Sequence, residues 1–304
     1  MSKKVVEKAL RDARNSSELS LPGPLDEVPE EIGELTQLQY LGLPIVAAER
    51  LPESLWSLRN LRDLDLYVPR GGLPEGIANL TQLACLTLRG RQPLTREGYP
   101  LAALPSTFSK LRRLELLKLI DTEFTDIPDV VLELPALTTL EVLGARFERL
   151  TPKIAKLPGL VSFVLNGTGV RVIPPEIGQL RALTQLQLEK TRLQELPEAI
   201  GELSGLTSLA IREGNMKALP SSLGRLSALT FLSVSNLPLV EFPSAILELP
   251  ALETLFLNKC GLTEVPDALL ALPSLQLANL DVNPLSPECY ARLKSYPKRR
   301  GVEL

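Results

Sequence analysis

Apolar residues recur along the chain in the arrangement Leu-x-x-Leu-x-Leu, and the arrangement returns at nearly constant intervals. Successive copies begin 23 residues apart, except for one step of 22 and one of 31. A fixed period of this size predicts a solenoid, in which each copy is one structural unit stacked on the next. The copies begin at Leu38, Leu61, Leu83, Leu114, Leu137, Leu160, Leu183, Leu206, Leu229, Leu252 and Leu275.

The copy that begins at Leu206 shows how the first half of a unit is predicted to fold. Leu209 and Ile211 are two residues apart, which is the spacing of side chains on one face of a β-strand. Ser208 and Ala210 alternate with them and are therefore expected on the opposite face. We expect a short strand that buries its leucine face.

The second half of the same copy predicts a short helix. Leu219 is expected to point inward, and Pro220 suits the first turn of a helix of roughly two turns, because its missing N–H needs no partner there. Leu223 and Leu226 are three residues apart and would bury one side of that helix. A single copy cannot bury all its leucines, so the core is expected to form by stacking of neighbours.

A second element, Leu-Pro-x-x-Ile/Leu-Gly-x-Leu, accompanies the leucines, for example from Leu196 to Leu203. Together the two patterns resemble the leucine-rich-repeat family, in particular the 23-residue type found in plant Ras-group proteins, Roco proteins and bacterial effectors. The resemblance covers about residues 17–285. It implies an α/β solenoid, or horseshoe, with a parallel concave sheet, short helices on the convex side and helical caps at both ends.

The chain departs from this family at one position. The family usually has asparagine three residues after the sixth-position leucine, where its side chain bonds to neighbouring turns. Only Asn283 keeps it here, while residues such as Val46, Pro69 and Leu237 cannot form the same bonds. We therefore expect less regular turns on that edge. The same position holds Thr122, Thr168, Thr191 and Cys260.

The unbroken repeat predicts one domain with a cap at each end. Residues 1–16 are expected to form an N-terminal capping helix, with Val5, Val6, Ala9, Leu10 and Ala13 at helical spacing. Residues 17–285 would form the solenoid, with a degenerate first repeat, whose strand is Glu18–Leu21, and about 11 full ones. Residues 286–304 are assigned to a C-terminal cap and tail, with a helix from Pro287.

The 31-residue step adds eight residues to the 23-residue period, within Arg89–Pro105. Its glycine, proline and charge content predicts a loop. Insertions in such arrays emerge on one edge, often the binding edge, so Arg91, Arg96 and Tyr99 are candidate contacts. The equally weighted alternative is a tolerated surface insertion.

Charge and cysteine content limit the function. The net charge of −3 does not favour nucleic acid or a membrane surface as partner. Cys85, Cys260 and Cys289 are far apart in the sequence, and no apolar run of signal-peptide length begins the chain. These features predict a cytoplasmic protein, or one delivered into a host cell by a signal-independent route.

Catalytic chemistry finds no support in the sequence. There is no histidine, which removes histidine general bases and histidine metal ligands, and no phosphate-binding loop. The dispersed cysteines cannot form a zinc cluster, and Cys85 lacks an evident activating base. Asp63 and Asp65 are interpreted as part of a solvated face. We predict no catalytic residue, no cofactor and no metal.

The residues between the buried leucines are expected to line the concave face. Phe231 is the third residue of its copy and Phe256 the fifth of the next, so their rings should lie within reach on neighbouring strands. Asn258 and Lys259 lie near them in sequence, and aromatic side chains ringed by polar groups are typical of binding hot spots. The alternative is that a sheet face tolerates scattered exposed hydrophobes.

A second apolar group on the same face spans three predicted strands, and Tyr67 is included among the candidate contacts. The same two interpretations, partner contact or tolerated hydrophobes, apply to it. The group comprises Leu116, Ile120, Leu143 and Val164.

The sequence therefore predicts a module for protein–protein interaction, monomeric and without enzymatic activity, that binds a protein or peptide on its concave face. The alternative is a substrate-recruiting repeat region of a secreted bacterial effector or signalling regulator whose catalytic domain lies elsewhere. The charge balance and the scarcity of aromatic platforms disfavour nucleic acid, glycan or lipid as ligand.

Overall fold

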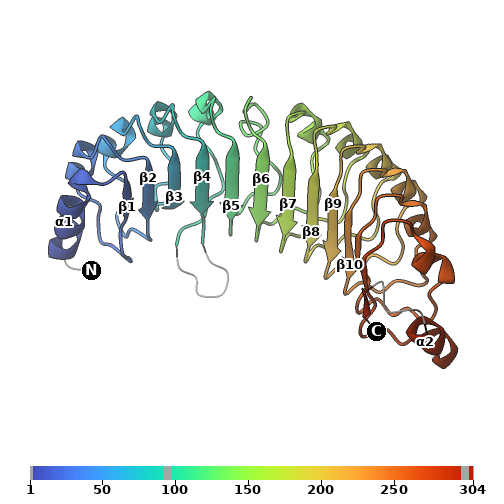
Figure 1. The fold of residues 1–304 in the computed structure, drawn as a ribbon. Coiled ribbons are helices and arrows are strands. Elements are labelled where there is room, and N and C mark those ends of the chain that lie inside the picture. Colours follow the sequence, from blue (N-terminus) through green and yellow to red (C-terminus); the bar gives the residue numbers. More distant parts are fainter. Residues whose placement is uncertain (1–2, 92–97, 296–300, 304) are drawn as a thin grey trace. The chain divides into compact units, whose positions relative to one another are not determined.

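The structure is a computed structural model that describes residues 3–91, 98–295 and 301–303. Short parallel strands, one from each repeat and one from the C-terminal tail, form its main layer. The chain divides into two units, Met1–Arg146 and Phe147–Leu304. Within each unit, strands that follow one another in sequence are neighbours in the sheet (Figure 1).

The described residues of the first unit form six strands. Asp63 pairs with Cys85 and Cys85 with Leu116, so the inserted residues between the last two strands leave the register unchanged. The strands are β1 (Glu18–Ser20), β2 (Tyr40–Leu43), β3 (Asp63–Tyr67), β4 (Cys85–Arg89), β5 (Leu116–Ile120) and β6 (Thr139–Leu143).

In the part of the second unit that the structure describes, seven strands have the same parallel arrangement. Phe231 pairs with Ser208 on one side and with Thr254 on the other. The strands are β7 (Ser162–Asn166), β8 (Gln185–Glu189), β9 (Ser208–Arg212), β10 (Phe231–Ser235), β11 (Thr254–Phe256), β12 (Leu277–Asn279) and β13 (Gly301–Glu303).

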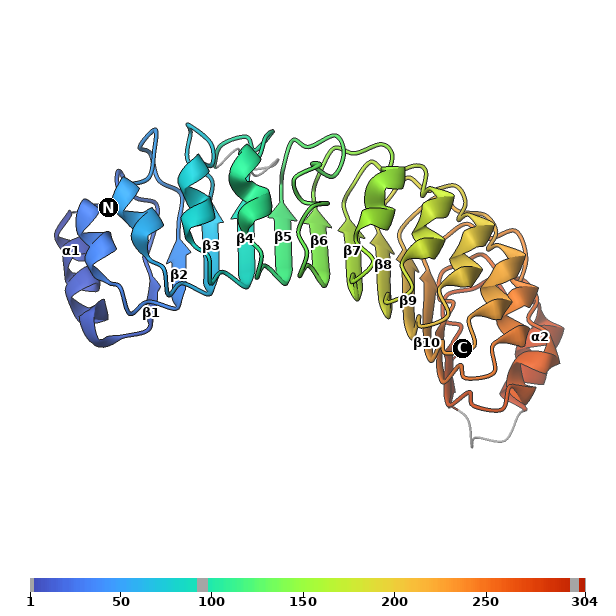
Figure 2. The same ribbon diagram turned by 90° about the horizontal axis from the view of Figure 1, so that it is seen from above.

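Short 3-10 helices form a second layer behind the strands of each unit, and the described part of each unit also has one α-helix (Figure 2). In the first unit these are α1 (Lys3–Asp12) and the 3-10 helices η1 (Ala13–Asn15), η2 (Glu30–Glu34), η3 (Glu53–Ser57), η4 (Glu75–Asn79) and η5 (Ser106–Lys110). In the second unit they are η6 (Pro152–Lys156), η7 (Pro175–Gln179), η8 (Glu198–Glu202), η9 (Ser221–Arg225), η10 (Ser244–Glu248), η11 (Asp267–Ala271) and α2 (Pro287–Lys294).

The leucine ladder forms the core, as the spacing predicts. Leu206, Leu209, Leu223 and Leu226 are each 0% exposed, and Ile211 is 2% exposed. The alternating residues of most strands are half-buried on the opposite side, which we call the open sheet face. The predicted orientation of the repeat is confirmed.

The helical half of the repeat differs from the prediction in three details. Pro220 precedes η9 as an extended residue, with φ −66° and ψ 148°, and its carbonyl accepts the Leu223 N–H at 3.1 Å. The helix itself is a five-residue 3-10 turn, shorter than the two turns expected. Leu219, expected to point inward, is only half-buried.

The two ends of the chain carry the α-helices. In α1, Val6 and Leu10 are buried while Val5 is exposed, and in α2 Leu293 is buried. The strand β13 was not predicted: Gly301 pairs in parallel with Leu277, although the sequence assigned this segment to the tail. The domain limits at residues 16 and 286 stay predictions.

A left-handed residue follows the strand in most repeats. It lies seven positions after the first leucine, shortly after the end of the strand. Glycine occupies the position at Gly144 and Gly167, but side chains occupy it elsewhere, including the β-branched Val282 with φ 61°. The other non-glycine residues with positive φ are Asp121, Lys190, Glu213, Asn236 and Lys259.

The asparagine position next to this turn behaves differently from repeat to repeat. The Asn283 amide accepts the N–H of Cys260 at 2.9 Å and donates to the Leu257 carbonyl at 2.8 Å. Among the residues that the structure describes, the buried hydroxyls of Thr122 and Thr168 have no hydrogen-bond partner. The expected irregularity on this edge is therefore a loss of bonds at particular repeats.

Candidate interaction surface on the open sheet face

An aromatic pair stands on the open face of the second unit. The rings of Phe231 and Phe256 have centroids 5.8 Å apart and planes tilted by 47°. Ser233 is the register partner of Phe256, so the two phenylalanines are offset by two residues on the neighbouring strands β10 and β11. Both rings remain half-exposed, and the predicted geometry of the pair is confirmed.

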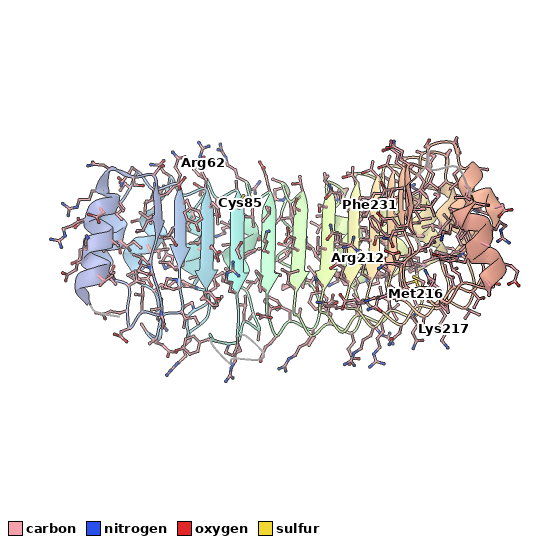
Figure 3. The ribbon with its side chains drawn as sticks, turned by 60° about the horizontal axis from the view of Figure 1, so that its bottom comes forward. Arg62, Cys85, Arg212, Met216, Lys217 and Phe231 are labelled. Atoms are coloured by element: carbon pink, nitrogen blue, oxygen red, sulfur yellow. The ribbon has the colours of Figure 1, made fainter. Side chains whose placement is uncertain are left out.

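A hydrogen-bonded polar network lies beside the aromatic pair. The Ser235 hydroxyl donates to Asn258 Oδ1 at 2.7 Å and lies 3.2 Å from the Ser233 hydroxyl. Arg212 Nε donates to that Ser233 hydroxyl at 2.9 Å, and Arg212 also forms an ion pair of 3.2 Å with Glu189. Figure 3 shows Arg212 and Phe231 on the strands, with Met216 and Lys217 in the loop beyond them.

This network fixes the direction of the Asn258 amide. Because Oδ1 accepts the Ser235 hydroxyl, the Nδ2 group is left as a donor, and it has no acceptor among the described residues. A half-exposed donor held by buried serines can bond a peptide carbonyl without reorganising. Ser233, Ser235 and Arg212 were not singled out in the sequence, where alternation gives a face but not its pairings.

Lys259 occupies a different place from the aromatic pair. It is the left-handed residue after β11 and lines a hollow of about 470 Å³ at the carboxyl ends of the strands. Glu213 and Asn236, the equivalent residues of the two preceding repeats, line the same hollow. The structure thus places Asn258 beside the rings and Lys259 at the end of the strands.

The predicted aliphatic group is interrupted by charge. Ile120 is the register partner of Leu143, and both are half-buried on the open face of the first unit. Leu116 lies four residues before Ile120 on β5, and between them Lys118 forms an ion pair of 3.1 Å with Glu141 of β6. Val164 belongs to β7 of the second unit and is half-buried there.

Tyr67 is held in a charged cluster of the first unit. Arg89 donates from Nε and Nη2 to the two carboxylate oxygens of Asp65, at 2.8 and 2.9 Å. The same guanidinium lies over the Tyr67 ring, 5.7 Å from its centroid. Bidentate pairing raises the pKa of Arg89 and fixes the geometry of this cluster.

Cys85, labelled in Figure 3, is the half-buried thiol of the first unit's open face. Burial raises the pKa of this thiol, and the neighbouring charge of Asp63 raises it further. Burial also raises the pKa of Asp63, with a further contribution from Asp65. A thiol with a raised pKa is a weak nucleophile at neutral pH.

Tyr99 of the insertion contacts the preceding repeat. The Arg70 guanidinium lies 5.3 Å from the centroid of the Tyr99 ring. Arg91 is exposed and forms no ion pair with a described residue. Arg96 falls outside the described residues, so its place in the proposed edge stays a prediction.

Two other kinds of site, a membrane-spanning helix and a metal centre, are absent from the described part of the chain. No helix there is long and apolar enough to cross a membrane. No three side chains among its cysteines, aspartates and glutamates meet in an arrangement that could hold a metal ion.

The family assignment rests on the repeats themselves. A model described as a leucine-rich repeat region matches residues 24–157 and 151–237, which together span more than half of the 304 residues. The chain belongs to the leucine-rich-repeat family. Proteins of this family are interaction modules without a catalytic centre, and their fold is a general scaffold for protein–protein contacts. No curated protein matches the leucine-rich-repeat chain significantly.

Solved structures with the same fold come from bacteria and plants. A leucine-rich-repeat protein of Leptospira interrogans is 23% identical, with a TM-score of 0.59, over 100% of this chain and 92% of the other. An internalin of Listeria monocytogenes is 19% identical, with a TM-score of 0.70, over 99% and 92%. A plant peptide hormone receptor, solved with RGF2, is 24% identical, with a TM-score of 0.64, over 90% and 45%.

Proposed function

We propose that the leucine-rich-repeat chain binds a protein or peptide partner across the open sheet face of its second unit. The single observation that carries the proposal is the half-exposed pair Phe231–Phe256 beside a fixed polar network. Two rigid rings supply apolar contact at a low cost in side-chain entropy. The Asn258 amide supplies a preorganised donor next to them.

If the two rings anchor the partner, the loss of binding free energy on their removal can be estimated. Truncating a buried interface aromatic costs about 2 kcal/mol or more of binding free energy. At about 1.4 kcal/mol per decade, this loss corresponds to roughly thirtyfold in affinity. The rings lie on the face opposite the leucine core, so their removal is expected to leave the fold intact.

The test is calorimetric titration with a partner recovered by affinity capture and mass spectrometry. Phe231→Ala/Phe256→Ala should weaken binding by about thirtyfold or more. The matched control is Val172→Ala/Val240→Ala, which truncates two exposed apolar side chains of the same unit away from this face. Equal affinities for the aromatic variant and the wild type would contradict the proposal.

The environment of the chain forms part of the same proposal. Cys85, Cys260 and Cys289 are free thiols, and the last two are buried. Free buried thiols suit a reducing compartment, which supports a cytoplasmic location. Sedimentation and thiol titration of the natural protein test the monomeric state and the reduced thiols.

A further inference from the structure

A groove in the first unit lies outside the open sheet face. It has a volume of about 970 Å³ and is lined by residues of α1, of η2, of the start of η3 and of the segments that precede η2 and η3. Its apolar floor includes Leu10, Val28, Leu35 and Leu51, each at most 7% exposed. Such a floor offers limited apolar contact, so recognition here depends chiefly on the charged rim.

The rim of the groove is acidic. Seven carboxylates and three guanidiniums line it, which gives a local charge of −4 against −3 for the whole chain. Arg14 forms an ion pair with Glu34, with Nη2 3.3 Å from Oε2. The Glu30 carboxylate accepts a hydrogen bond from the Ser54 N–H at 3.2 Å. Four rim glutamates form no ion pair with any side chain that the structure describes: Glu7, Glu27, Glu31 and Glu53.

The distribution of these carboxylates distinguishes between cationic ligands. A metal ion needs several oxygen ligands at one point, and no such convergence occurs among the described side chains. Carboxylates spread along a groove instead match ammonium or guanidinium groups spread along a chain. An apolar floor beneath them matches a segment with one apolar side.

We propose that this groove binds a short basic amphipathic segment of a partner protein. The apolar side chains of that segment rest on the floor at Val28 and Leu51, and its lysine or arginine side chains pair with Glu27, Glu31 and Glu53. The binding is salt-sensitive, because the pairs are exposed to solvent. The groove belongs to the first unit, so this site does not depend on the proposed function of the second.

The experiment measures anisotropy of a fluorescein-labelled amphipathic peptide with lysine on one face and leucine on the other. Glu27→Gln/Glu31→Gln/Glu53→Gln should weaken its binding about eightfold, from about twofold for each exposed pair lost. The control Glu148→Gln/Glu195→Gln/Glu241→Gln changes the net charge equally in the second unit and should shift the affinity less than about twofold. All proteins must first show matching thermal melts.

A steric variant locates the site independently of charge. Ala48 lines the groove and is half-buried, so Ala48→Trp would fill the space and is expected to abolish binding without lowering the melting temperature. Equal losses in the two glutamine variants, or wild-type binding by Ala48→Trp, would overturn the proposal. A salt-sensitive dimer seen by sedimentation and lost in the rim variant would assign the groove to a second copy and also overturn it.

Discussion

The hydroxyl of Thr168 gives a stability prediction whose sign the structure determines. The residue is 3% exposed and occupies the asparagine position of its repeat, where its Oγ1 has no hydrogen-bond partner among the described residues. Burying an unpaired hydroxyl costs about 1–3 kcal/mol. Thr168→Val removes the hydroxyl and keeps the shape, so we expect it to stabilise the protein.

A second threonine of the same unit is the matched control. Thr151 is 8% exposed and caps η6, where its Oγ1 accepts the Lys153 N–H at 3.3 Å. Thr151→Val removes this cap and should destabilise the protein by about 1 kcal/mol. The same chemical change is therefore expected to act with opposite signs at two buried positions.

The assay is thermal and urea unfolding followed by circular dichroism. A gain of about 1 kcal/mol in Thr168→Val should raise the melting temperature by about 2–4 °C for a unit of this size. Thr151→Val should lower it by a similar amount. If Thr168→Val lowers stability as Thr151→Val does, the Thr168 hydroxyl has a bonding partner and the reasoning fails.

Further predictions concern the core, the turns and the charged face. Leu209→Asp places an unpaired charge at a fully buried position and should lower the free energy of unfolding by several kcal/mol, on the order of the total stability of the protein. A melting curve like that of the wild type would contradict this prediction. Val282→Gly relieves a positive φ at a 70% exposed residue and should stabilise by about 1 kcal/mol in urea unfolding, whereas a loss would contradict the strain. Because folding raises the pKa of Asp63, its charge opposes folding at neutral pH and the penalty fades as pH falls through that pKa. Asp63→Asn should therefore raise the melting temperature at pH 7 and less so near pH 4, and a gain that is larger at low pH would refute this sign.

The leucine period made the strands, their order and their buried faces predictable. A repeat of 23 residues brings Ser208 beside Phe231 and Ser233 beside Phe256 without any further information. The aromatic pair could be predicted for the same reason, because its geometry depends only on register.

Features that depend on side-chain conformation or on weak patterns could not be predicted. The segment Gly301–Glu303 lacks the leucine spacing, so pairing with β12 rather than a sequence signal makes it a strand. The Arg212–Ser233 bond and the Arg70–Tyr99 contact join residues of neighbouring repeats, and the period does not specify the rotamers of these side chains. The groove beside α1 arises where the cap meets the degenerate first repeat.

The central claim, that the aromatic pair is the anchor for a partner, is tested most directly by fluorine NMR. The chain has seven phenylalanines, so labelling with 4-fluorophenylalanine gives few resonances, which single Phe→Leu variants assign. Addition of the captured partner should shift the resonances of Phe231 and Phe256 and leave the fully buried Phe108, Phe147 and Phe163 unchanged. Saturating binding that leaves the resonances of Phe231 and Phe256 unmoved would contradict the account.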